Sequence, residues 1–593
     1  MSELKDIRHS AEHILTQAML RLYPGKFQMA MGPATDDGFY FDFEALGDFK
    51  INEADFPTIE AEMKKIVKEN LPIIKKEISL DEAKKLFSGN PYKLEWLDGI
   101  KDRNEIITVY YTGDQFFDLC AGPHVRYTSQ VKAFKLLSIA GAYWHGDEKN
   151  KMLTRIYGTA LENKEALEKY LTNIEEAKKR DHRKIGKDLD LFSIDDSVGP
   201  GLILWHPKLS VVREEIELYW RSEHRKRNYQ YVYTPHIGQS NLWQTSGHLQ
   251  TFKEGLFPPM SMKSKDEKED VTYYVKPMSC PFHIRIYKSH PRSYRELPIR
   301  WCELGSVYRY EESGVLHGML RVRGFTQDDA HIICTEDQFV DEVNKILDFA
   351  LDMNKTFGFN KLNIYLSVRD PKNKEKYIGE ERIWKLAEST LEEILQKRKV
   401  EYKKDIGGAK FYGPAIDLKA VDAMGREWQG TTIQLDMNEP SRFEMKYTGS
   451  DGQEHTPIML HRTLLGSMER FVGTLIEQFA GAFPVWLSPV QAKIIPITDN
   501  QLKYAQKISE ILKEKNIRVE IDDRAETMQN KIRSAAMEKI PYLLIVGDRE
   551  ANSADNQISV RQRDGQDLGS MPLESFLKQI TGQISTKSLN LIK

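Results

Sequence analysis

The stretch that decides the fold is Tyr308-Arg309-Tyr310-Glu311, continued by Arg321-Val322-Arg323-Gly324-Phe325-Thr326-Gln327-Asp328-Asp329-Ala330-His331. A second arginine stands further along, in Gly466-Ser467-Met468-Glu469-Arg470. An arginine offers a rigid fork of donors that a lysine lacks, so Arg309 and Arg470 can hold both ends of a triphosphate whose α-phosphorus is attacked. This pairing predicts ATP bent over an antiparallel sheet, and adenylation chemistry rather than kinase chemistry.

The bulk composition sets broad limits on size and partners. The chain has 593 residues, which at roughly 150 residues per domain suggests about four units. Lys+Arg number 85 and Asp+Glu 88, which gives a net charge of -3. The net charge therefore gives no sign of nucleic-acid binding, and any contact with RNA must use local positive patches.

The cysteines and the first residues bear on the compartment. Cys120, Cys280, Cys302 and Cys334 are too few and too scattered for a disulfide framework, so we expect no structural disulfides. This usage favours a reducing cytoplasm and leaves metal ligation open. The first six residues lack the apolar core of a signal peptide, and no run of about 18 apolar residues could span a bilayer. We expect a soluble cytoplasmic protein with no membrane partner.

Hydrophobic periodicity divides the chain into four parts. Residues 1–165 mix helical spacing with short strands and predict an α+β domain, and residues 166–187 predict a connecting helix that breaks at Gly186. Residues 188–488 alternate long helices with β-rich runs, while residues 489–593 alternate strands with helices and predict an α/β domain.

Two segments are expected to be poorly ordered. The polar stretch Ser261–Asp270 predicts a mobile surface loop, and the tail after Thr586 is expected to fray.

The motifs quoted above resemble those of the threonyl-tRNA synthetase family, which belongs to the class II aminoacyl-tRNA synthetases. Arg309-x-Glu311 with its continuation to His331 is similar to motif 2, and Glu469-Arg470 is similar to the end of motif 3. Tyr231-Val232-Tyr233-Thr234-Pro235 is similar to motif 1. Each match is weak alone, but their order and spacing are specific, and the resemblance covers almost the whole chain.

This resemblance implies a multidomain fold of α+β and α/β parts. A class II antiparallel-sheet catalytic core would span 188–488, preceded by an N-terminal α+β editing domain over 1–165 and a linker helix over 166–187. A C-terminal α/β anticodon-binding domain would span 489–593. Many family members carry a small ubiquitin-like domain ahead of the editing domain. Here the editing motif begins by His9, so we expect that domain to be absent.

The resemblance also assigns the phosphate-binding residues. Arg309 would hold the α-phosphate of ATP, Glu311 would face the adenine end, and Arg470 would hold the γ-phosphate with Arg321 assisting. Mg²⁺ would bridge the phosphates. For either motif taken alone, the alternative is a cross-strand ion pair between Arg309 and Glu311, with Arg470 capping a helix.

One Zn²⁺ per subunit is implied by the same resemblance, with Cys280, His331 and His461 as its ligands. One thiolate and two imidazoles suit Zn²⁺, and three protein ligands leave a position open, as in catalytic sites. In the family the amino group and β-hydroxyl of threonine complete the coordination and exclude valine, and Asp329 receives the hydroxyl. Taken singly, Cys280 could be a buried small hydrophobe and each histidine a satisfied polar residue.

The family's amino-acid and adenylate pocket contributes further candidates. The positions that match it are Gln327, Tyr412, Gln434 and Ser467.

Serine requires a second, hydrolytic site, because it keeps both coordinating groups and differs by one methyl, worth only about 1 to 3 kcal/mol. His9 and His13 lie one turn apart on one predicted helical face, and Cys120 and His124 flank a Gly-Pro turn. These residues match the family's editing site. The same pocket includes positions similar to Tyr40, Lys93 and Asp118. Three histidines and a cysteine could equally ligate a metal, but we favour metal-free hydrolysis.

The C-terminal part resembles the family's anticodon-binding module. Bases in a single-stranded loop expose edges for hydrogen bonding, and Arg533, Glu550 and Arg561 are our candidates for reading them. For each of the two arginines, the alternative is a solvated surface charge.

The sequence argues against a class I synthetase and a P-loop ATPase, and proteolysis is a poor alternative. His236-Ile237-Gly238-Gln239 and Met262-Lys263-Ser264-Lys265 superficially resemble class I signatures, but the final histidine is absent and no Rossmann domain fits between them. The sequence also lacks a Gly-x-x-x-x-Gly-Lys-Ser/Thr loop. No glutamate directly follows His9, so the zinc-protease motif is missing.

The resemblance therefore predicts a threonine-tRNA ligase. It would activate threonine with ATP, transfer the threonyl group to the 3′-hydroxyl of tRNA(Thr), and hydrolyse mischarged seryl-tRNA(Thr). Because motif 1 builds the dimer interface of class II enzymes, a homodimer is expected. The alternatives are a catalytically silent RNA-binding regulator of the same fold and an enzyme with intact synthesis and weak editing.

Overall fold

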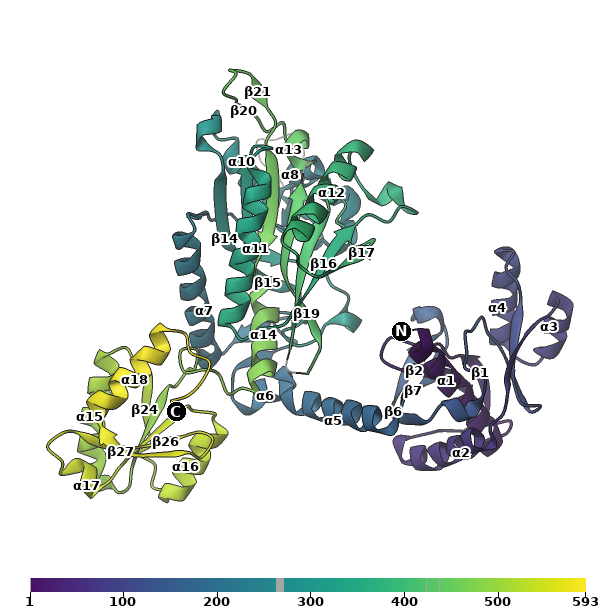
Figure 1. Ribbon diagram of the computed structural model, residues 1–593, viewed down its shortest axis with the longest axis horizontal. Helices are drawn as coiled ribbons and strands as arrows, with labels where there is room; N and C mark the ends of the chain where they lie inside the picture. Colours follow the sequence, from purple (N-terminus) through teal and green to yellow (C-terminus); the bar gives the residue numbers. More distant parts are fainter. Residues whose placement is uncertain (1, 263–270, 423, 437, 593) are drawn as a thin grey trace. The chain divides into compact units, whose positions relative to one another are not determined.

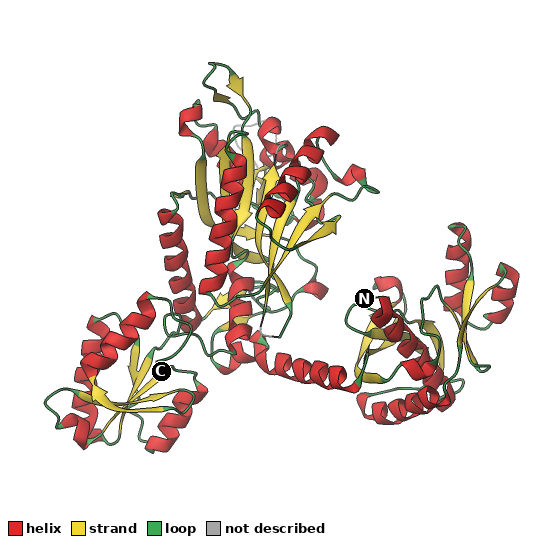
Figure 2. Cartoon of the chain, in the orientation of Figure 1, coloured by secondary structure: helices red, strands yellow, loops and turns green. Residues whose placement is uncertain are grey.

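The structure is a computed structural model that describes residues 2–262, 271–422, 424–436 and 438–592. The chain folds into two compact units, residues 1–175 (the N-terminal unit) and residues 176–593 (the C-terminal unit). Figure 1 traces the chain by residue number and Figure 2 by secondary structure. Of the loop expected over Ser261–Asp270, residues 263–270 lie outside the described residues, and Met262 ends strand β12 (Met260–Met262).

The N-terminal unit is built on a four-stranded antiparallel sheet in the order β1-β2-β7-β6. Its strands are β1 (Phe27–Met31), β2 (Phe39–Ala45), β7 (Met152–Leu161) and β6 (Ala133–Tyr143). Helix α1 (Ser2–Leu22) packs on this sheet, because the predicted helical stripe that includes Ile14 and Ala18 is fully buried in the unit's core. Helix α2 (Phe56–Glu69) contributes Ile59 to the same core.

A second, smaller sheet completes the N-terminal unit. It has the order β3-β4-β5, with antiparallel pairs throughout. Its strands and the two helices of the same region are β3 (Ile73–Glu77), β4 (Thr108–Thr112), β5 (Phe116–Leu119), α3 (Leu80–Leu86) and α4 (Pro91–Asp102). The unit is therefore α+β, as the sequence predicted.

The connecting segment consists of two helices, α5 (Lys164–Arg180) and α6 (His182–Asp188). The predicted break at Gly186 is wrong, because the helices separate at Asp181, whose carboxylate caps α6 by accepting a hydrogen bond from the Arg183 amide (2.8 Å). Gly186 lies inside α6, where a Cβ atom would come within 2.4 Å of the Phe192 ring. A packing requirement, rather than a helix end, explains this glycine.

The C-terminal unit contains an eight-stranded sheet in the order β10-β14-β15-β22-β19-β18-β16-β17. The strands are β10 (Gln230–Tyr231), β14 (Ile299–Tyr308), β15 (Gly324–Cys334), β22 (Ile458–Thr463), β19 (Glu427–Asp436), β18 (Ala415–Val421), β16 (Leu362–Val368) and β17 (Tyr402–Ile406). The six central strands pair antiparallel, and only the two edge strands pair parallel to their neighbours. This is the predicted antiparallel-sheet core.

The apolar core of this sheet includes side chains of α7 (Pro207–Lys226), α11 (Phe339–Thr356), α12 (Glu381–Lys397) and α14 (Met468–Phe479). Trp220 of α7 is fully buried there, and its indole donates to Asp328 on β15 (2.8 Å). The buried Arg462 of β22 also donates to Asp328 (3.0 Å). These contacts fix β15 and β22 side by side, which matters for the site described below.

Shorter elements surround the large sheet. The antiparallel sheet β11-β13-β12 comprises β11 (Ile237–Gln239), β13 (Val271–Val275) and β12. The others are β8 (Phe192–Ile194), β9 (Ile203–Trp205), α8 (Ser240–Ser246), α9 (His248–Thr251), α10 (Cys280–Tyr287), α13 (Glu439–Arg442), β20 (Tyr447–Thr448) and β21 (Glu454–His455).

The last hundred residues form a five-stranded sheet in the order β24-β23-β25-β26-β27 with helices around it. The strands are β23 (Ala492–Pro496), β24 (Val519–Ile521), β25 (Tyr542–Val546), β26 (Gln557–Gln562) and β27 (Asp567–Pro572). The helices are α15 (Leu502–Glu514), α16 (Met528–Met537), α17 (Asp548–Ala551) and α18 (Leu573–Ser585). The predicted alternation of strands and helices is confirmed.

The expected fraying after Thr586 is wrong. The Ile592 amide donates to the Tyr542 hydroxyl (2.8 Å), and Leu591 and Ile592 pack on the core of this part. Apolar contact and a satisfied backbone amide hold the segment in place.

All four cysteines are free thiols. Across the described ranges, no helix combines the length and apolar character that crossing a membrane demands.

Candidate active site

Arg309 lies directly after β14, at the start of the loop that joins this strand to β15 (the hairpin loop, residues 309–323). Its guanidinium donates to the carbonyl of Pro277 (3.2 Å) and to Oε1 of Gln327 on β15 (3.4 Å). Burial lowers the pKa of Arg309. Within the described residues it forms no ion pair with a carboxylate, so its charge is oriented by neutral groups and available to an anion.

Glu311 and Arg321 pair across the hairpin loop, with the Arg321 guanidinium donating to the Glu311 carboxylate (2.9 Å). The alternative pairing of Arg309 with Glu311 is therefore not observed. Half of the Arg321 side chain is exposed, and exposed ion pairs contribute little to stability. Either partner can turn toward a ligand at small cost.

Arg470 stands in the first turn of α14 and reaches back to the hairpin loop, where it donates to the Leu320 carbonyl (2.9 Å). The helix cap is Ser467, whose hydroxyl accepts from the Arg470 amide (3.3 Å), so the capping role considered for Arg470 is wrong. An isolated β-bridge joins Ser467 to Gln327. The predicted residues Arg309, Gln327, Ser467 and Arg470 thus converge at the same end of the neighbouring strands β14, β15 and β22.

The three predicted metal ligands also come together. Cys280 begins α10, and His331 on β15 lies directly opposite His461 on β22 in the strand register. Their candidate ligand atoms all lie within 4.8 Å of one another, and all three residues are buried. Residues far apart in the sequence are joined here by strand pairing.

Hydrogen bonds determine which ring nitrogens face the centre of this group. Nε2 of His461 is 2.8 Å from the Asp436 carboxylate, so it carries a proton, and Nδ1 faces His331 and is bare in the neutral ring. Burial would lower the pKa of His461, but the Asp436 carboxylate raises it overall. Nδ1 of His331 is 2.7 Å from Nδ1 of His283, which leaves Nε2 of His331 as the nitrogen that faces His461.

The donor set fits a zinc ion. Nε2 of His331 and Nδ1 of His461 are only 3.0 Å apart, and two lone pairs at that distance repel unless a cation or proton lies between them. A ligating histidine typically donates its other N–H to a carboxylate or another acceptor, and here the outer ring nitrogens contact Asp436 and His283. Burial raises the pKa of the Cys280 thiol well above its ordinary value, so zinc binding would have to displace its proton.

Sequence reasoning missed His283 and Asp436, which orient the two imidazoles. A signal existed for both. His283 follows Cys280 by three residues on α10, and Asp436 follows Gln434 by two residues on β19, so each shares a face with a predicted residue.

The predicted amino-acid pocket lies beside this group. The Tyr412 hydroxyl donates to Oε1 of Gln434 (2.7 Å), and the Tyr412 and His461 rings are 5.1 Å apart. Asp329 is buried, lies 3.9 Å from Nε2 of His331, and has its pKa raised by burial. A carboxyl and an amide carbonyl thus flank the three ligands.

In the N-terminal unit the structure brings His9, His13, Cys120 and His124 together. Their candidate ligand atoms lie within 4.8 Å of one another. The Cys120 thiol is 3.3 Å from Nε2 of His9 and 3.2 Å from Nε2 of His124. Burial lowers the pKa of His124 to about 2 and raises that of Cys120 to about 12. The cluster is therefore uncharged near neutral pH.

Two further predicted residues border this cluster. Lys93 and Asp118 form a buried ion pair (2.6 Å), and the Asp118 charge acts to raise the pKa of His9. Burial is the larger influence and lowers that pKa overall. Sequence reasoning missed Glu12, which is buried beside His13 and whose pKa burial raises well above its ordinary value.

The contacts of Tyr40 differ from those of the other predicted editing residues. The Arg155 guanidinium stacks 3.8 Å from the centre of its ring, and Arg155 also pairs with Asp42 (2.6 Å). The contacts of Tyr40 in the described part of the chain therefore tie it to its neighbours in the sheet.

The anticodon candidates lie on three different elements of the C-terminal part. Glu550 is engaged within the fold, since its carboxylate accepts from the Gly547 amide and from the Ser559 hydroxyl (2.9 Å each). Arg561 pairs with Asp567 at the surface (3.1 Å). Arg533 on α16 is exposed and, among the described residues, makes no hydrogen bond or ion pair.

The antiparallel sheet, with its two arginines beside a cluster of buried polar side chains, is that of a class II aminoacyl-tRNA synthetase. Residues 262–479 match the family model described as tRNA synthetase class II core domain (G, H, P, S and T). Residues 491–583 match the Anticodon binding domain, and residues 107–157 match the Threonyl and Alanyl tRNA synthetase second additional domain.

Comparison with known proteins identifies the particular family. The chain is 49% identical over 587 residues to the threonine-tRNA ligase of a Sulfurihydrogenibium species, covering 98% of this chain and 89% of that protein. The identity to the threonine-tRNA ligase of Aquifex aeolicus is 51% over 587 residues, 98% of this chain and 90% of that protein. The chain belongs to the threonine-tRNA ligase family.

A solved structure gives the same result. The crystal structure of the RNA binding domain of threonyl-tRNA synthetase from Cryptosporidium parvum Iowa II superposes with a TM-score of 0.63 and 35% identity, covering 68% of this chain and 98% of that one.

Proposed function

We propose that this chain charges tRNA(Thr) with threonine. It forms threonyl-adenylate from threonine and ATP, transfers the threonyl group to the 3′-hydroxyl of the tRNA, and hydrolyses seryl-tRNA(Thr). The observation that carries this proposal is that Arg309, directly after β14, contacts Gln327 on β15, the strand that also carries His331 opposite His461 of β22. Phosphate-binding and amino-acid-selecting groups therefore serve one reaction.

Arg309 and Arg470 supply the charge for ATP activation. Arg309 holds the α-phosphate, where negative charge develops as the carboxylate of threonine attacks, and preorganised donors at such a point lower the barrier. Arg470 holds the γ-phosphate with Arg321, and Glu311 faces the adenine end. Mg²⁺ bound with ATP would neutralise part of the negative charge of its phosphates.

Threonine is selected beside Cys280, His331 and His461, which would hold one Zn²⁺. That ion would supply open coordination positions for the amino group and β-hydroxyl of the substrate. Asp329 receives the hydroxyl, and Tyr412 and Gln434 line the pocket. Valine lacks the hydroxyl, which leaves the buried carboxyl of Asp329 without its partner and disfavours binding.

Hydrolysis of seryl-tRNA is proposed for the cluster of His9, His13, Cys120 and His124. Burial keeps its imidazoles neutral, so one of them can accept a proton from an attacking water. Lys93 and Asp118 would position the ester, with Tyr40 at the border of the pocket. We propose that this step proceeds without a metal.

For the tRNA, Arg533 and Arg561 are the candidates for base contacts, because their charges lie at the surface. Glu550, the third candidate, would have to give up its contacts to Gly547 and Ser559 to read a base. We propose domain limits of 1–165, 166–187, 188–488 and 489–593 for editing, linker, catalysis and anticodon binding.

A homodimer is proposed on the surface around motif 1. Leu218 on α7, Tyr233 after β10 and Ile237 on β11 are large apolar side chains with 55%, 76% and 43% exposure. Burial of such side chains against a second copy is favourable. We propose a cytoplasmic location.

Amino-acid-dependent exchange of pyrophosphate into ATP tests the activation step. We expect strong exchange with threonine, weaker exchange with serine and none with valine. No exchange with any amino acid would instead support the silent RNA-binding regulator. Hydrolysis of preformed seryl-tRNA(Thr) tests the editing activity separately, and persistent seryl-tRNA would support an enzyme with weak editing.

A further inference from the structure

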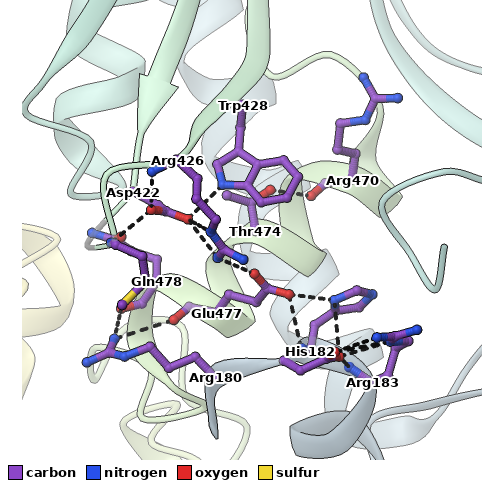
Figure 3. Close-up of polar contacts among 12 residues, drawn as sticks. Arg180, His182, Arg183, Asp422, Arg426, Trp428, Arg470, Thr474, Glu477 and Gln478 are labelled. Carbon is purple, nitrogen blue, oxygen red and sulfur yellow. Dashed lines mark hydrogen bonds and ion pairs between the residues drawn. The ribbon is translucent and has the colours of Figure 1, made fainter. Parts of the chain in front are cut away.

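A buried polar network lies at the far end of α14 from Arg470, and the proposed mechanism does not use it. Figure 3 shows Glu477 at its centre, with His182 on one side and Arg426 on the other. Oε1 of Glu477 accepts from the His182 amide (3.2 Å) and from Nδ1 of the same residue (2.7 Å). Oε2 accepts from the Arg426 guanidinium. Both carboxylate oxygens are therefore engaged.

The protonation of the His182 ring follows from its partners. Nε2 of His182 lies 3.0 Å from the Met319 amide, which can only donate. Nε2 is therefore bare, and Nδ1 carries the proton that is donated to Glu477. His182 has no exposed surface. In its observed orientation, Nδ1 is paired with Glu477 and Nε2 with the Met319 amide.

Met319 belongs to the hairpin loop, next to the residue that holds Arg470. The Leu320 carbonyl accepts from the Arg470 guanidinium (2.9 Å). A continuous chain of contacts thus runs from Glu477 through His182 and the backbone of Met319 and Leu320 to Arg470. Glu477 and Arg470 lie on the same helix, so the chain closes a ring between α14, α6 and the hairpin loop.

Two glycines allow this close approach. A Cβ atom on Gly318 would lie 2.1 Å from Nε2 of His182, and the backbone there has a φ of +49°. On Gly473 of α14, a Cβ atom would meet Met319 and Leu320 at 3.1 Å. The loop, the helix and His182 are therefore packed without free space.

Further contacts anchor the base of the network. Arg426 donates to the Asp422 carboxylate (2.8 Å), which also accepts from the Trp428 indole (2.8 Å). Arg180 donates to the Gln478 carbonyl at the C-terminus of α14 (3.1 Å), where a positive charge is favourable. Glu477 is held on a fixed support, so a shift of His182 would move the hairpin loop rather than the helix.

We propose that His182 is a positioning residue for amino-acid activation. By holding the Met319 amide, it fixes the Leu320 carbonyl against which Arg470 is aimed. The inference rests on the proposed role of Arg470 in binding ATP. A positioning error of about 1 Å can cost about 100-fold in rate, so loss of the His182 contact should act chiefly on ATP and not on threonine.

The decisive experiment is a double-mutant cycle in pyrophosphate exchange with the full chain. We expect His182→Ala to lower kcat/KM for ATP by about 10-fold or more and to leave KM for threonine within about twofold. In the background of Arg470→Ala, adding His182→Ala should lower kcat/KM no further, because the two residues act through one contact. Additive losses would overturn the proposal.

Lys184→Ala is the matched control, since Lys184 lies on the same helix in an exposed ion pair with Asp188 (2.7 Å). It should behave like the unmodified chain. Gly318→Ala is the second variant, which displaces the loop while keeping His182, and it should lower kcat/KM for ATP in the same way. An unchanged kcat/KM for ATP in Gly318→Ala would contradict the proposal.

Pyrophosphate exchange by the unmodified chain tests the proposed function separately from the positioning role of His182. If the unmodified chain exchanges strongly and His182→Ala matches it, the function stands and the positioning role fails. Hydrolysis of seryl-tRNA by the same variants should be unchanged, which shows that the N-terminal unit is folded, and the retained KM for threonine shows the same for the C-terminal unit.

Discussion

His331 and His461 lie opposite each other on adjacent strands with their facing ring nitrogens 3.0 Å apart. Each ring is held from behind, His331 by His283 and His461 by Asp436. The two bare nitrogens are therefore presented before any metal arrives, which reduces the cost of ordering the site.

Asp436→Asn should weaken zinc binding by about 10- to 100-fold, because the amide cannot enforce the same tautomer of His461. Competition with a zinc-specific chelator measures the effect. Asp451→Asn is the control, since Asp451 pairs with His455 at the surface (2.9 Å). An affinity equal to that of the unmodified chain would argue against these ligands.

Cys280→Ala should remove the bound zinc altogether, since only two protein ligands would remain. Elemental analysis of the purified protein gives the metal content per chain. Cys334→Ala is the matched control, because Cys334 is also a buried thiol but lies in the apolar core. Zinc retained by the Cys280 variant would refute the triad.

Arg309→Ala should abolish threonine-dependent pyrophosphate exchange, with a loss of at least about 100-fold, because it removes preorganised charge at the α-phosphate. Hydrolysis of preformed seryl-tRNA(Thr) should persist, since the proposed editing cluster lies in the N-terminal unit. If the variant still formed the adenylate, the assignment of Arg309 to the α-phosphate would be wrong.

Changing His9 and His13 together to alanine should let seryl-tRNA(Thr) accumulate while threonylation proceeds at its normal rate. Charging assays with serine and with threonine measure the two outcomes. His145→Ala is the control, since His145 lies in the same unit at the surface. If no seryl-tRNA accumulates, the cluster is not the editing site.

The same cluster predicts how stability depends on pH. Burial depresses the pKa of His13, of His9 and of His124, the last from 6.5 to about 2. Below about pH 6.5 the unfolded chain binds more protons than the folded one at these groups, so their contribution to stability is lost as the pH falls. The raised pKa of Glu12 acts in the opposite direction above its ordinary value of 4.5.

Three histidines outweigh one glutamate, so the N-terminal unit should be less stable at pH 5 than at pH 7. Hydrogen exchange of the α1 amides, corrected for the intrinsic rate at each pH, measures this. His124→Asn should make the difference smaller. Equal protection at both pH values would show that the histidines are not neutral in the fold.

The sequence was most informative where a local pattern decides the structure. The apolar stripe of α1 and the alternation from Ile494 to Val546 predicted their elements, because periodicity depends only on neighbouring residues. The helix break was predicted at Gly186, but it lies at Asp181. Gly186 is required for close packing against Phe192, and the local sequence does not reveal that contact.

The candidate site could be assembled only through the family resemblance. Cys280, His331 and His461 are distant in the chain, and strand register alone makes two of them neighbours. His283 and Asp436 were missed because their importance comes from the ring nitrogens they touch. Likewise, nothing in the sequence around Glu550 indicated that its carboxylate is used within the fold.

Strand β15 has a consequence for substrate size. Gln327, Asp329 and His331 alternate along it and share one face. At about 3.3 Å per residue, the four steps from Gln327 to His331 set a span of about 13 Å between the proposed phosphate-binding end and the proposed metal-binding end. Because the spacing of these side chains along the strand is fixed, a longer amino acid cannot fit by shifting its position along β15. A one-residue deletion within β15 would turn the side chains on one side of the deletion to the opposite face of the sheet. Both amino-acid selection and activation should then be lost.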